Sequence, residues 1–567
     1  MRYLALACDY DGTLATHGSV DKKTIAVLER VLASGRKLLL VTGRELDDLL
    51  KVFPETHLFE RIVAENGALL YHPESREEKL LAERPLQAFV EALRKRNVSP
   101  LSVGRSIVAT WHPHETTVIE VIRELGLELQ VIFNKGAVMV LPTGVNKGTG
   151  LAAALADLGL SPHNVVGVGD AENDHAFLSL CECSVAVANA LETLKQRADV
   201  TTEGDHGIGV AELIEKLLEN DLAKHNSRLR RHEILLGHDP EGQEVRITPH
   251  GCRVLVAGPS GSGKSTVVTA LLERLVEKRY QFCLVDPEGD FETFGDAVAL
   301  GDEHHTPSPE EIVRLLEKFE NAVLNLLGVP LTDRTAYFPA LLARIQELRR
   351  QTGRPHWLVL DEAHHLLPAT WRPAALTVPQ EIGSAIFVTV HPDHMSRAAL
   401  SAVDVVLAVG ASPEETISSF CKAVDQPLPA GAHTELENLE VLAWFRTSQR
   451  PPVRVRVLPG ASERRRHRRK YAQGDIQEKS FYFRGPEGKL NLKAQNLVIF
   501  VQLAEGVDDQ TWLHHLKRGD YSHWVREAIK DEGLADEIAK LERSDLPTAE
   551  SRALVKQAIE RQYTSAA

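Results

Sequence analysis

The sequence has few of the residues and segments that mark secreted or membrane proteins. Its 567 residues include only six cysteines and no CxxC pair, so a disulfide framework or a zinc site is not expected. No apolar run approaches the length that spans a bilayer. No basic segment with a cleavage site precedes the strand-like start at Tyr3. These absences predict a cytoplasmic protein without a membrane partner.

Positive charge is not in excess either. The formal net charge is -14, which argues against a protein coated along its whole length by nucleic acid but does not exclude one basic face. The chain is too long for a single hydrophobic core, so we expect about three or four domains.

Residues 1–222, here called the first module, alternate short apolar strands with amphipathic helices. This pattern predicts an α/β fold in which a parallel sheet is covered on both faces. The expected strands are Tyr3–Cys8, Lys37–Val41, Arg61–Ala64, Val165–Val168 and Ser184–Val187. Because ligands collect at the carboxyl ends of such strands, the residues that follow them are the first candidates for a site.

Acidic, hydroxyl and cationic residues stand after these strands and at the start of a later helix. The candidates are Asp9, Asp11, Thr42, Lys147, Asp170, Asn173 and Asp174. One carboxylate can attack phosphorus, and a second can protonate the leaving oxygen and then activate water. Several clustered acids need a hard cation such as Mg²⁺, while a lysine and a hydroxyl stabilise the transferring phosphoryl group. The set predicts phosphoester cleavage.

The order DxDGT, threonine, lysine and GDxxND resembles the haloacid dehalogenase (HAD) superfamily over all of the first module. The resemblance implies that Asp9 is the nucleophile and Asp11 the general acid/base. It also implies that Thr42 binds phosphate and Lys147 stabilises an aspartyl phosphate. For Mg²⁺ it implies a site made by the Asp9 and Asp170 carboxylates and the main-chain carbonyl of Asp11. Asp174 is expected to orient the metal.

Residues 85–140 read as helix, strand, helix, strand, inserted between a HAD Rossmann-like core at 1–84 and 141–222. The place and small size of this insertion resemble the C2-type α/β cap of sugar-phosphate and phosphoglycolate phosphatases. The resemblance implies a small phosphorylated metabolite as substrate.

Residues 228–458, here called the second module, contain a P-loop at 258–266, between an expected strand and an expected helix. In that context backbone N–H groups cradle the phosphates of ATP, Lys264 reaches the terminal phosphates and Ser265 holds Mg²⁺. The predicted nucleotide-binding residues are Gly258, Ser260, Gly261, Ser262, Gly263, Lys264, Ser265 and Thr266.

Two further strand ends of the second module carry polar residues. Trp357–Leu360 leads to Asp361, expected in the Mg²⁺ shell, and to Glu362, expected to orient the attacking water. Ala385–Val390 leads to His391, where a polar group could sense the γ-phosphate.

The P-loop, the DPEGDF and DEAHH segments and a predicted hairpin at residues 233–247 together resemble the HerA–FtsK-like P-loop ATPases. The resemblance implies a RecA-like fold, ATP hydrolysis and a homo-oligomer, with a hexameric ring as the expected form. His391 stands where relatives often carry glutamine, so the resemblance implies ATP hydrolysis more directly than translocation.

Residues 471–567 are predicted to form a small, mainly α accessory domain. Before them lies the strongest basic run of the chain, Arg464 to Lys470. Such a run is typical either of a nucleic-acid or anionic-partner contact or of a linker.

Two functions are favoured by the sequence, over a third in which the HAD site only binds a phosphorylated signal and gates the ATPase, because both sites have their full set of chemical groups. The first is a Mg²⁺-dependent phosphatase of small metabolites fused to an oligomeric ATPase. The alternative is an ATP-driven nucleic-acid translocase whose HAD module processes phosphorylated DNA or RNA ends. The basic run favours the alternative, whereas the acidic net charge and the cap placement favour the first.

Overall fold

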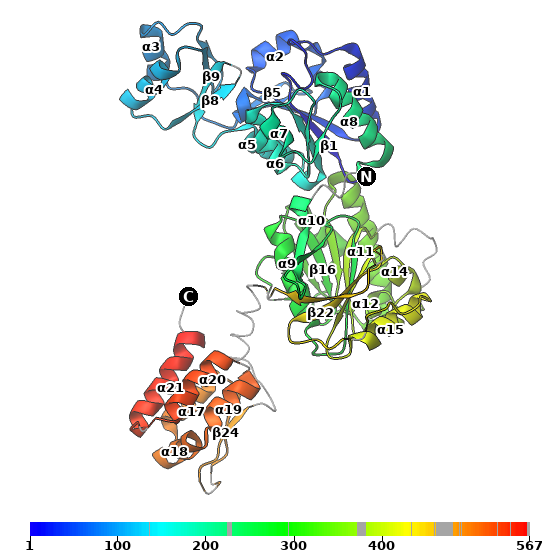
Figure 1. Ribbon diagram of the computed structural model, residues 1–567, viewed down its shortest axis with the longest axis vertical. Coiled ribbons are helices and arrows are strands. Elements are labelled where there is room, and N and C mark those ends of the chain that lie inside the picture. The colour runs from blue at the N-terminus through cyan, green and yellow to red at the C-terminus, as the bar shows by residue number, and fades with distance from the viewer. Residues whose placement is uncertain are drawn as a thin grey trace. The chain divides into compact units, whose positions relative to one another are not determined.

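The computed structural model describes residues 1–563 except 135, 224–229, 293, 371–381, 433, 449, 459, 461–479, 487, 489, 530 and 545. The chain forms two compact units, Met1–Lys264 with Arg274–Val457 and Ser265–Glu273 with Leu458–Ala567. The first unit contains an eight-stranded, an eleven-stranded and a four-stranded sheet. Figure 1 shows these sheets in blue to gold and the helices of the C-terminal segment in orange and red.

The eight-stranded sheet belongs to the first module, with the order β12-β11-β10-β1-β2-β3-β4-β5. Its strands are β1 (Ala5–Cys8), β2 (Lys37–Val41), β3 (Arg61–Ala64), β4 (Leu69–His72), β5 (Glu77–Leu80), β10 (Val165–Gly169), β11 (Cys183–Ala186) and β12 (Val200–Thr201). The six strands from β12 to β3 are parallel; the sequence predicted five of them and missed the two-residue β12.

The last two strands correct the prediction of a wholly parallel sheet, because β4 pairs antiparallel with β3 and β5 antiparallel with β4. The reversal occurs in the short turn η2 (Glu65–Gly67). Glu65, Asn66 and Gly67 all have positive φ, at 50°, 55° and 106°. This left-handed run sends the chain straight back beside β3, so no crossover helix follows.

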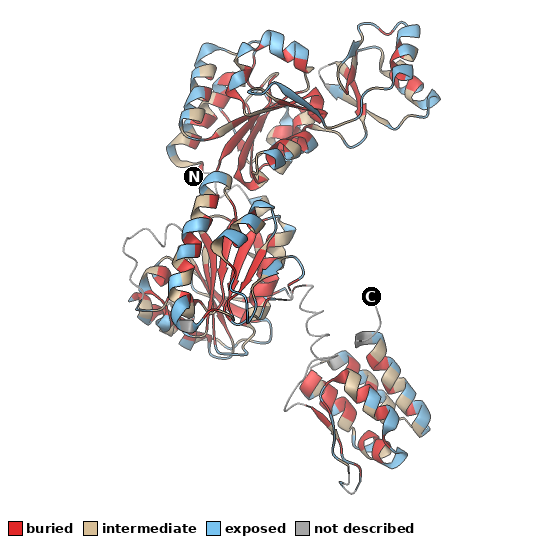
Figure 2. Cartoon of the chain, turned by 180° about the vertical axis from the view of Figure 1, so that it is seen from behind, coloured by how far each residue is buried: buried red, intermediate tan, exposed pale blue. Residues whose placement is uncertain are grey.

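Helices cover the faces of this sheet. They are α1 (Lys22–Ala33), α2 (Leu46–Val52), α5 (Lys147–Asp157), α6 (His175–Leu180), α7 (Glu192–Lys195) and α8 (His206–Asn220). α1 packs against α8, and α5 packs against α6. Figure 2 shows the inner strands as buried and the outer faces of these helices as exposed, while the edge strand β5 is exposed along its length. Burial on both faces explains why the strands read as continuous apolar runs.

The cap is a four-stranded antiparallel sheet, β6-β7-β9-β8, with two helices. Its elements are α3 (Gln87–Lys95), β6 (Ser102–Val103), β7 (Val108–Trp111), α4 (Glu115–Glu124), β8 (Leu129–Asn134) and β9 (Ala137–Pro142). The sequence predicted α3, β7, α4 and β8 and missed β6 and β9. Phe89 and Leu93 of α3 and Val118 and Val121 of α4 form the cap's own apolar core.

The second module contains the eleven-stranded sheet, with the order β14-β13-β23-β22-β21-β15-β20-β19-β16-β18-β17. Its strands are β13 (Ile234–His238), β14 (Glu244–Ile247), β15 (Arg253–Ala257), β16 (Phe282–Asp286), β17 (Val298–Leu300), β18 (Ala322–Asn325), β19 (Trp357–Leu360), β20 (Ser384–Thr389), β21 (Val405–Val409), β22 (Glu440–Phe445) and β23 (Val453–Val457). The strands from β21 to β17 are parallel. The predicted hairpin is confirmed as β13 and β14.

The helices of this module are α9 (Lys264–Glu277), α10 (Pro309–Glu317), α11 (Leu331–Thr352), α12 (Ala363–Leu366), α14 (Arg397–Ser401) and α15 (Pro413–Val424). α9 begins directly after the P-loop. α10 begins at a capping box, in which the Ser308 and Glu311 side chains each accept a backbone N–H of the other residue.

The first and second modules meet at the amino-terminal ends of their parallel strands. His163, which precedes β10, lies with its Nε2 2.7 Å from the carbonyl of Lys278, which precedes β16. Arg354, which precedes β19, donates to the carbonyl of Gly159 at 3.0 Å. The carboxyl ends of the two sheets, where the candidate residues stand, therefore lie away from this junction.

The C-terminal part consists of β24 (Phe481–Phe483), β25 (Leu492–Ala494), α17 (Leu497–Gly506), α18 (Asp509–Arg518), α19 (Asp520–Trp524), α20 (Glu532–Glu542) and α21 (Thr548–Tyr563). Phe500, Trp512 and Tyr521 are buried in its core. It is mainly helical, as predicted. The basic run Arg464 to Lys470 lies outside the described residues. Among the helices described, none is both long and apolar enough to cross a membrane.

The turn at Gly67 supports the helix that carries Lys147. A Cβ at Gly67 would lie 2.0 Å from the carbonyl oxygen of Asn146, the N-cap of α5. We expect Gly67→Ala to lower the free energy of unfolding by about 3 kcal/mol, through left-handed strain and overpacking. Urea denaturation measures it. Gly35→Ala, also at positive φ but with open space around the new Cβ, should cost about 1 kcal/mol. Equal losses in the two variants would contradict the packing argument.

Candidate active sites

Three buried carboxylates meet at the carboxyl edge of the first sheet. Asp9 follows β1, Asp170 follows β10 and Asp174 lies in η4 (Glu172–Asp174). One oxygen of each lies within 4.8 Å of one oxygen of the others. Asp174 is held by the backbone, because its Oδ2 accepts from the N–H groups of Asp170 and Ala171, both at 2.9 Å. Residues more than 150 positions apart are therefore brought to one point by the parallel register.

Lys147 enters this cluster from the first turn of α5. Its Nζ donates to Asp9 Oδ1 at 2.5 Å and to Asp174 Oδ1 at 2.6 Å. Burial lowers the pKa of Lys147, but the nearby carboxylates of Asp174 and Asp9 outweigh it and raise that pKa above the ordinary value. The lysine is therefore a fixed positive charge beside the predicted nucleophile.

The donor set fits one Mg²⁺ ion. Burial, followed by the carboxylate of Asp174, raises the pKa of Asp9 well above its usual range, although Lys147 opposes both. Three carboxylates and one ammonium leave two uncompensated negative charges in a buried site. A hard divalent cation with oxygen ligands would balance them and keep Asp9 ionised. Asp9, Asp170 and Asp174 would hold it.

Thr42 and Asp11 occupy different positions at this edge. Thr42 is fully buried after β2, and its Oγ1 accepts from the N–H of Arg44 at 3.1 Å. The Asp11 side chain is 41% exposed and does not belong to the group of three buried carboxylates. Its carboxylate binds the Arg44 guanidinium bidentately, at 2.6 and 2.7 Å. The sequence analysis did not name Arg44, and the available signal was its place two residues after the predicted Thr42.

Glu65 is a second residue that the sequence analysis missed. Its buried carboxylate accepts the backbone N–H groups of Arg105, Ser106 and Ile107 at 2.8, 2.7 and 3.1 Å. These three residues lie in the turn between β6 and β7, so Glu65 of the core holds the cap. The neighbouring Asn66 accepts a hydrogen bond from Asn173 at 3.2 Å. The same turn therefore contacts both the cap and the carboxylate-bearing loop.

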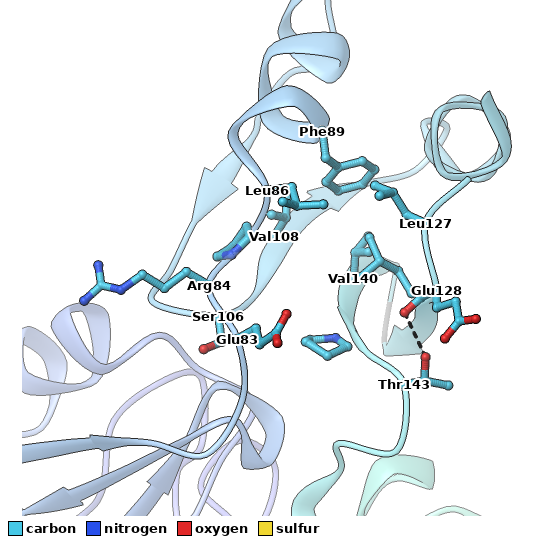
Figure 3. Close-up of a pocket in the computed structure, with 13 residues that line it drawn as sticks. Glu83, Arg84, Leu86, Phe89, Ser106, Val108, Leu127, Glu128, Val140 and Thr143 are labelled. Carbon is cyan, nitrogen blue, oxygen red and sulfur yellow. Dashed lines mark hydrogen bonds between the residues drawn. The ribbon is translucent and has the colours of Figure 1, made fainter. Parts of the chain in front are cut away.

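A pocket of about 400 Å³ lies between the cap and its two connections to the core. Figure 3 shows Glu83 and Arg84 of one connection and Thr143 of the other at its mouth, with Phe89 and Leu127 above. Thr143 donates to the carbonyl of Glu128 at 2.8 Å. The predicted catalytic residues stand in the core and do not line this pocket, so it is separate from the carboxylate site.

The P-loop of the second module needs glycine at specific points. Gly261 and Gly263 have φ of 73° and 99°, and a Cβ at Gly258 would lie 2.1 Å from the carbonyl oxygen of Val409. Lys264 Nζ donates to the carbonyls of Gly258 and Pro259 at 3.1 and 3.0 Å. The lysine thus lies across its own loop, in place to meet a phosphate. Ser260 and Ser262 lie in this loop, and Ser265 and Thr266 in the first turn of α9.

Asp361 and Glu362 follow β19 at the same edge. Burial, with the carboxylate of Asp286 next, raises the pKa of Asp361 to about 8. Burial also raises the pKa of Glu362. Glu362 has a φ of 39°, a strained conformation for a residue with a side chain. Such strain is common at functional sites.

His391 lies beside these acids because of the strand order. β20, which precedes it, pairs with the P-loop strand β15 on one side and with β19 on the other. The N–H of His391 donates to Thr389 Oγ1 at 3.1 Å, and the same oxygen lies 3.1 Å from His364 Nδ1. A group at the end of β20 can therefore reach a phosphate held between the P-loop and Asp361.

Two known families match the chain. The model of haloacid dehalogenase-like hydrolases matches residues 6–123 and 120–214, and the AAA ATPase domain matches residues 244–388. "Phosphoglycolate phosphatase 2" of Saccharolobus solfataricus is 30% identical over 230 residues, 39% of this chain and 95% of that protein. "Phosphoglycolate phosphatase" of Methanothermobacter thermautotrophicus is 31% identical over 228 residues, 38% of this chain and 98% of that protein.

A haloacid dehalogenase-like hydrolase from Bacteroides thetaiotaomicron is one similar solved structure, with 21% identity and a TM-score of 0.35 over 38% of this chain and 99% of that chain. The family model and the nearly full-length relatives agree with the carboxylate site of the first module. Through that module this protein belongs to the haloacid dehalogenase-like hydrolase family, and an AAA ATPase domain follows it on the same chain.

Proposed function

We propose that the first module is a Mg²⁺-dependent phosphomonoesterase that acts on a small phosphorylated metabolite through an aspartyl-phosphate intermediate. One observation carries the proposal: Lys147 bridges Asp9 and Asp174 in a buried site that Asp170 completes. Phosphoglycolate or a sugar phosphate is the proposed substrate. This choice of substrate rests on the placement of the cap and on the activity for which the two curated relatives are named.

The residues divide the reaction into two steps. An Asp9 oxygen attacks phosphorus while Asp11 gives its proton to the leaving oxygen, which departs as an alcohol. Asp11 then takes a proton from water, and the hydroxide attacks phosphorus, releasing phosphate and restoring Asp9. Lys147 and Thr42 stabilise charge on the phosphoryl oxygens. When bound, Mg²⁺ neutralises the carboxylates and polarises the phosphoryl group.

The Arg44 ion pair gives Asp11 a defined starting position. The guanidinium holds the carboxylate bidentately, next to the Thr42 loop. In this geometry Asp11 stays close to the phosphate site without joining the metal cluster. Asp11 has to leave this ion pair to act as the general acid/base, because a carboxylate held by a metal ion or by a guanidinium does not readily accept a proton.

For the second module we propose ATP hydrolysis by a homo-oligomer of the HerA–FtsK-like type, with a ring as the expected form. Lys264 would contact the terminal phosphates, Asp361 and Ser265 would hold Mg²⁺, and Glu362 would orient water. The preceding hairpin of β13 and β14 supports this assignment, whereas His391 after β20 departs from the glutamine that relatives often carry there. Light scattering of the full chain with and without ATP tests the assembly.

Asp9→Asn tests the phosphatase. We expect the unmodified chain with Mg²⁺ to release phosphate from phosphoglycolate or sugar phosphates, and Asp9→Asn to reduce release to background because the nucleophile is lost. Phosphate is measured over a panel that also holds oligonucleotides with 3′- or 5′-phosphate ends. Glu29→Gln, an exposed change on α1, is the matched control. Turnover of the oligonucleotides alone would replace this proposal with nucleic-acid end processing.

Glu362→Gln separates binding from hydrolysis in the second module. The amide keeps the size of the side chain but cannot accept a proton from water, so ATP hydrolysis should fall roughly 100-fold or more while nucleotide affinity is kept. Phosphate release and fluorescent-nucleotide titration measure the two. The exposed Glu292→Gln should match the unmodified chain. Undiminished hydrolysis in Glu362→Gln would remove this residue from the mechanism.

Asp361→Asn tests how much the buried Asp361 carboxylate lowers the free energy of unfolding. Because the folded chain holds a proton on Asp361 up to about pH 8, whereas the unfolded chain loses it near the ordinary value of 3.8, stability falls as pH rises between these values. In EDTA at pH 8, Asp361→Asn should be more stable than the unmodified chain by about 1–3 kcal/mol. Urea denaturation against pH measures the difference, with Asp296→Asn as control. An equally stable or less stable variant would show that the carboxylate is already compensated.

A further inference from the structure

One oxygen of the Glu362 carboxylate is buried without a hydrogen bond. Glu362 Oε2 has no hydrogen-bond partner among the described residues, although the side chain is only 15% exposed. The Nδ1 atom of His364 lies 3.3 Å from this oxygen. A buried acceptor without a partner lowers stability, so the residue beside it bears directly on how the Glu362 side chain is held.

His364 is itself held by a threonine that adjoins the P-loop. Its Nδ1 lies 3.1 Å from the Oγ1 atom of Thr389, a fully buried residue at the end of β20. The same oxygen accepts the N–H of His391 at 3.1 Å. The main-chain carbonyl of Thr389 accepts the N–H of Gly258, the first residue of the P-loop, at 3.4 Å. A continuous set of contacts therefore runs from the P-loop through Thr389 and His364 to Glu362.

The surroundings of His364 place its ring proton on Nδ1. Burial lowers the pKa of His364 to about 4, so the ring is neutral and carries one proton. Nδ1 lies between the Thr389 hydroxyl and the Glu362 carboxylate. An ionised carboxylate is only an acceptor, so a lone pair on Nδ1 would face the lone pairs of Glu362 Oε2. A proton on Nδ1 removes that repulsion and is donated to Thr389.

We propose that His364 is a positioning residue for ATP hydrolysis, whose Nδ1–H keeps the Glu362 carboxylate in place beside the P-loop. The inference rests on the proposed role of Glu362 in orienting water. Glu362 precedes α12 with a left-handed backbone, and His364 lies in α12. The two side chains therefore come from one short turn, and the contact of His364 with Thr389 fixes that turn against β20.

The consequence is that nucleotide binding and hydrolysis depend on different groups. Lys264 and the N–H groups of the P-loop are the proposed phosphate contacts, whereas His364 acts only through Glu362. Loss of the Nδ1 donor should therefore slow hydrolysis without weakening nucleotide binding. A merely structural role would lower both, together with stability.

Three substitutions of His364 in the full chain test the proposal. Asparagine can place an amide nitrogen where Nδ1 stands, glutamine can place one only near Nε2, and leucine has no donor. We expect kcat for ATP to stay within about threefold in His364→Asn and to fall roughly 10- to 100-fold in His364→Gln and His364→Leu, because a misplaced group loses its alignment with the reacting atoms. KM and the affinity for a fluorescent nucleotide should stay unchanged in all three. His305→Gln, at an exposed histidine of the same module, is the matched control.

The possible results separate this inference from the proposed ATPase. Equal kcat values in His364→Asn, His364→Gln and His364→Leu would overturn the role of the Nδ1 donor, whether those values are normal or reduced. A loss of nucleotide affinity that parallels the loss of kcat would overturn it as well. If the unmodified chain hydrolyses no ATP, the proposed ATPase fails and this inference fails with it.

Thr389→Val tests the link between His364 and the P-loop strand. Valine keeps the shape of threonine but has no oxygen to accept the His364 N–H. We expect kcat to fall in Thr389→Val and to fall no further when His364→Leu is added, because both changes release the same carboxylate. Losses that multiply in the double variant would show that the two residues act separately, and the proposed link would be wrong.

Discussion

Buried negative charge at the carboxyl ends of parallel strands is the constraint on which both active edges depend. In the first module Asp9, Asp170 and Asp174 cannot all be ionised in a dry site without more positive charge than Lys147 supplies. In the second module burial, followed by the nearby carboxylates of Asp286 and Glu362, raises the pKa of Asp361 to about 8. The divalent cation proposed for each edge would balance this negative charge, so the charge imbalance that lowers stability would also favour binding of the ion.

The turn at residues 65–67 makes the first edge possible. Its left-handed backbone lets Gly67 lie against Asn146, which begins the helix that presents Lys147. The same turn aims the Glu65 carboxylate at the cap and Asn66 at Asn173. A short strained segment thus sets the position of the lysine, the cap and the carboxylate loop together. Backbone strain is often retained where one segment must satisfy several such contacts.

The junction of the modules places their two reactions at opposite ends of the first unit. His163, Glu182, Tyr280 and Arg354 all precede strands, and they join the amino-terminal edges of the two sheets. A product of one site cannot pass directly to the other along this path. Any coupling between ATP hydrolysis and phosphoester cleavage has to pass through the sheets or through the junction.

The sequence by itself determined the chemistry and most of the framework. The DxDGT and P-loop segments identified the candidate site residues, because phosphoester cleavage and nucleotide binding need particular side chains at short, fixed spacings. Continuous apolar runs predicted five of the six parallel strands of the first sheet, because strands buried on both faces show no apolar–polar alternation. The sixth, β12, has only two residues and was not predicted. The antiparallel β4 and β5 escaped prediction because a left-handed turn at Glu65 and Asn66 has no strong sequence signal.

Only the tertiary structure decided which distant residues meet. Arg44 binds Asp11, Glu65 accepts hydrogen bonds from the cap, and His163 and His232 both lie beside Glu182. None of these pairs has a characteristic spacing, because each joins separate strand ends or separate modules. A sequence states what a short segment can do on its own, whereas contacts across elements are fixed by strand order and register. The catalytic motifs belong to the first kind, and the interactions that position them belong to the second.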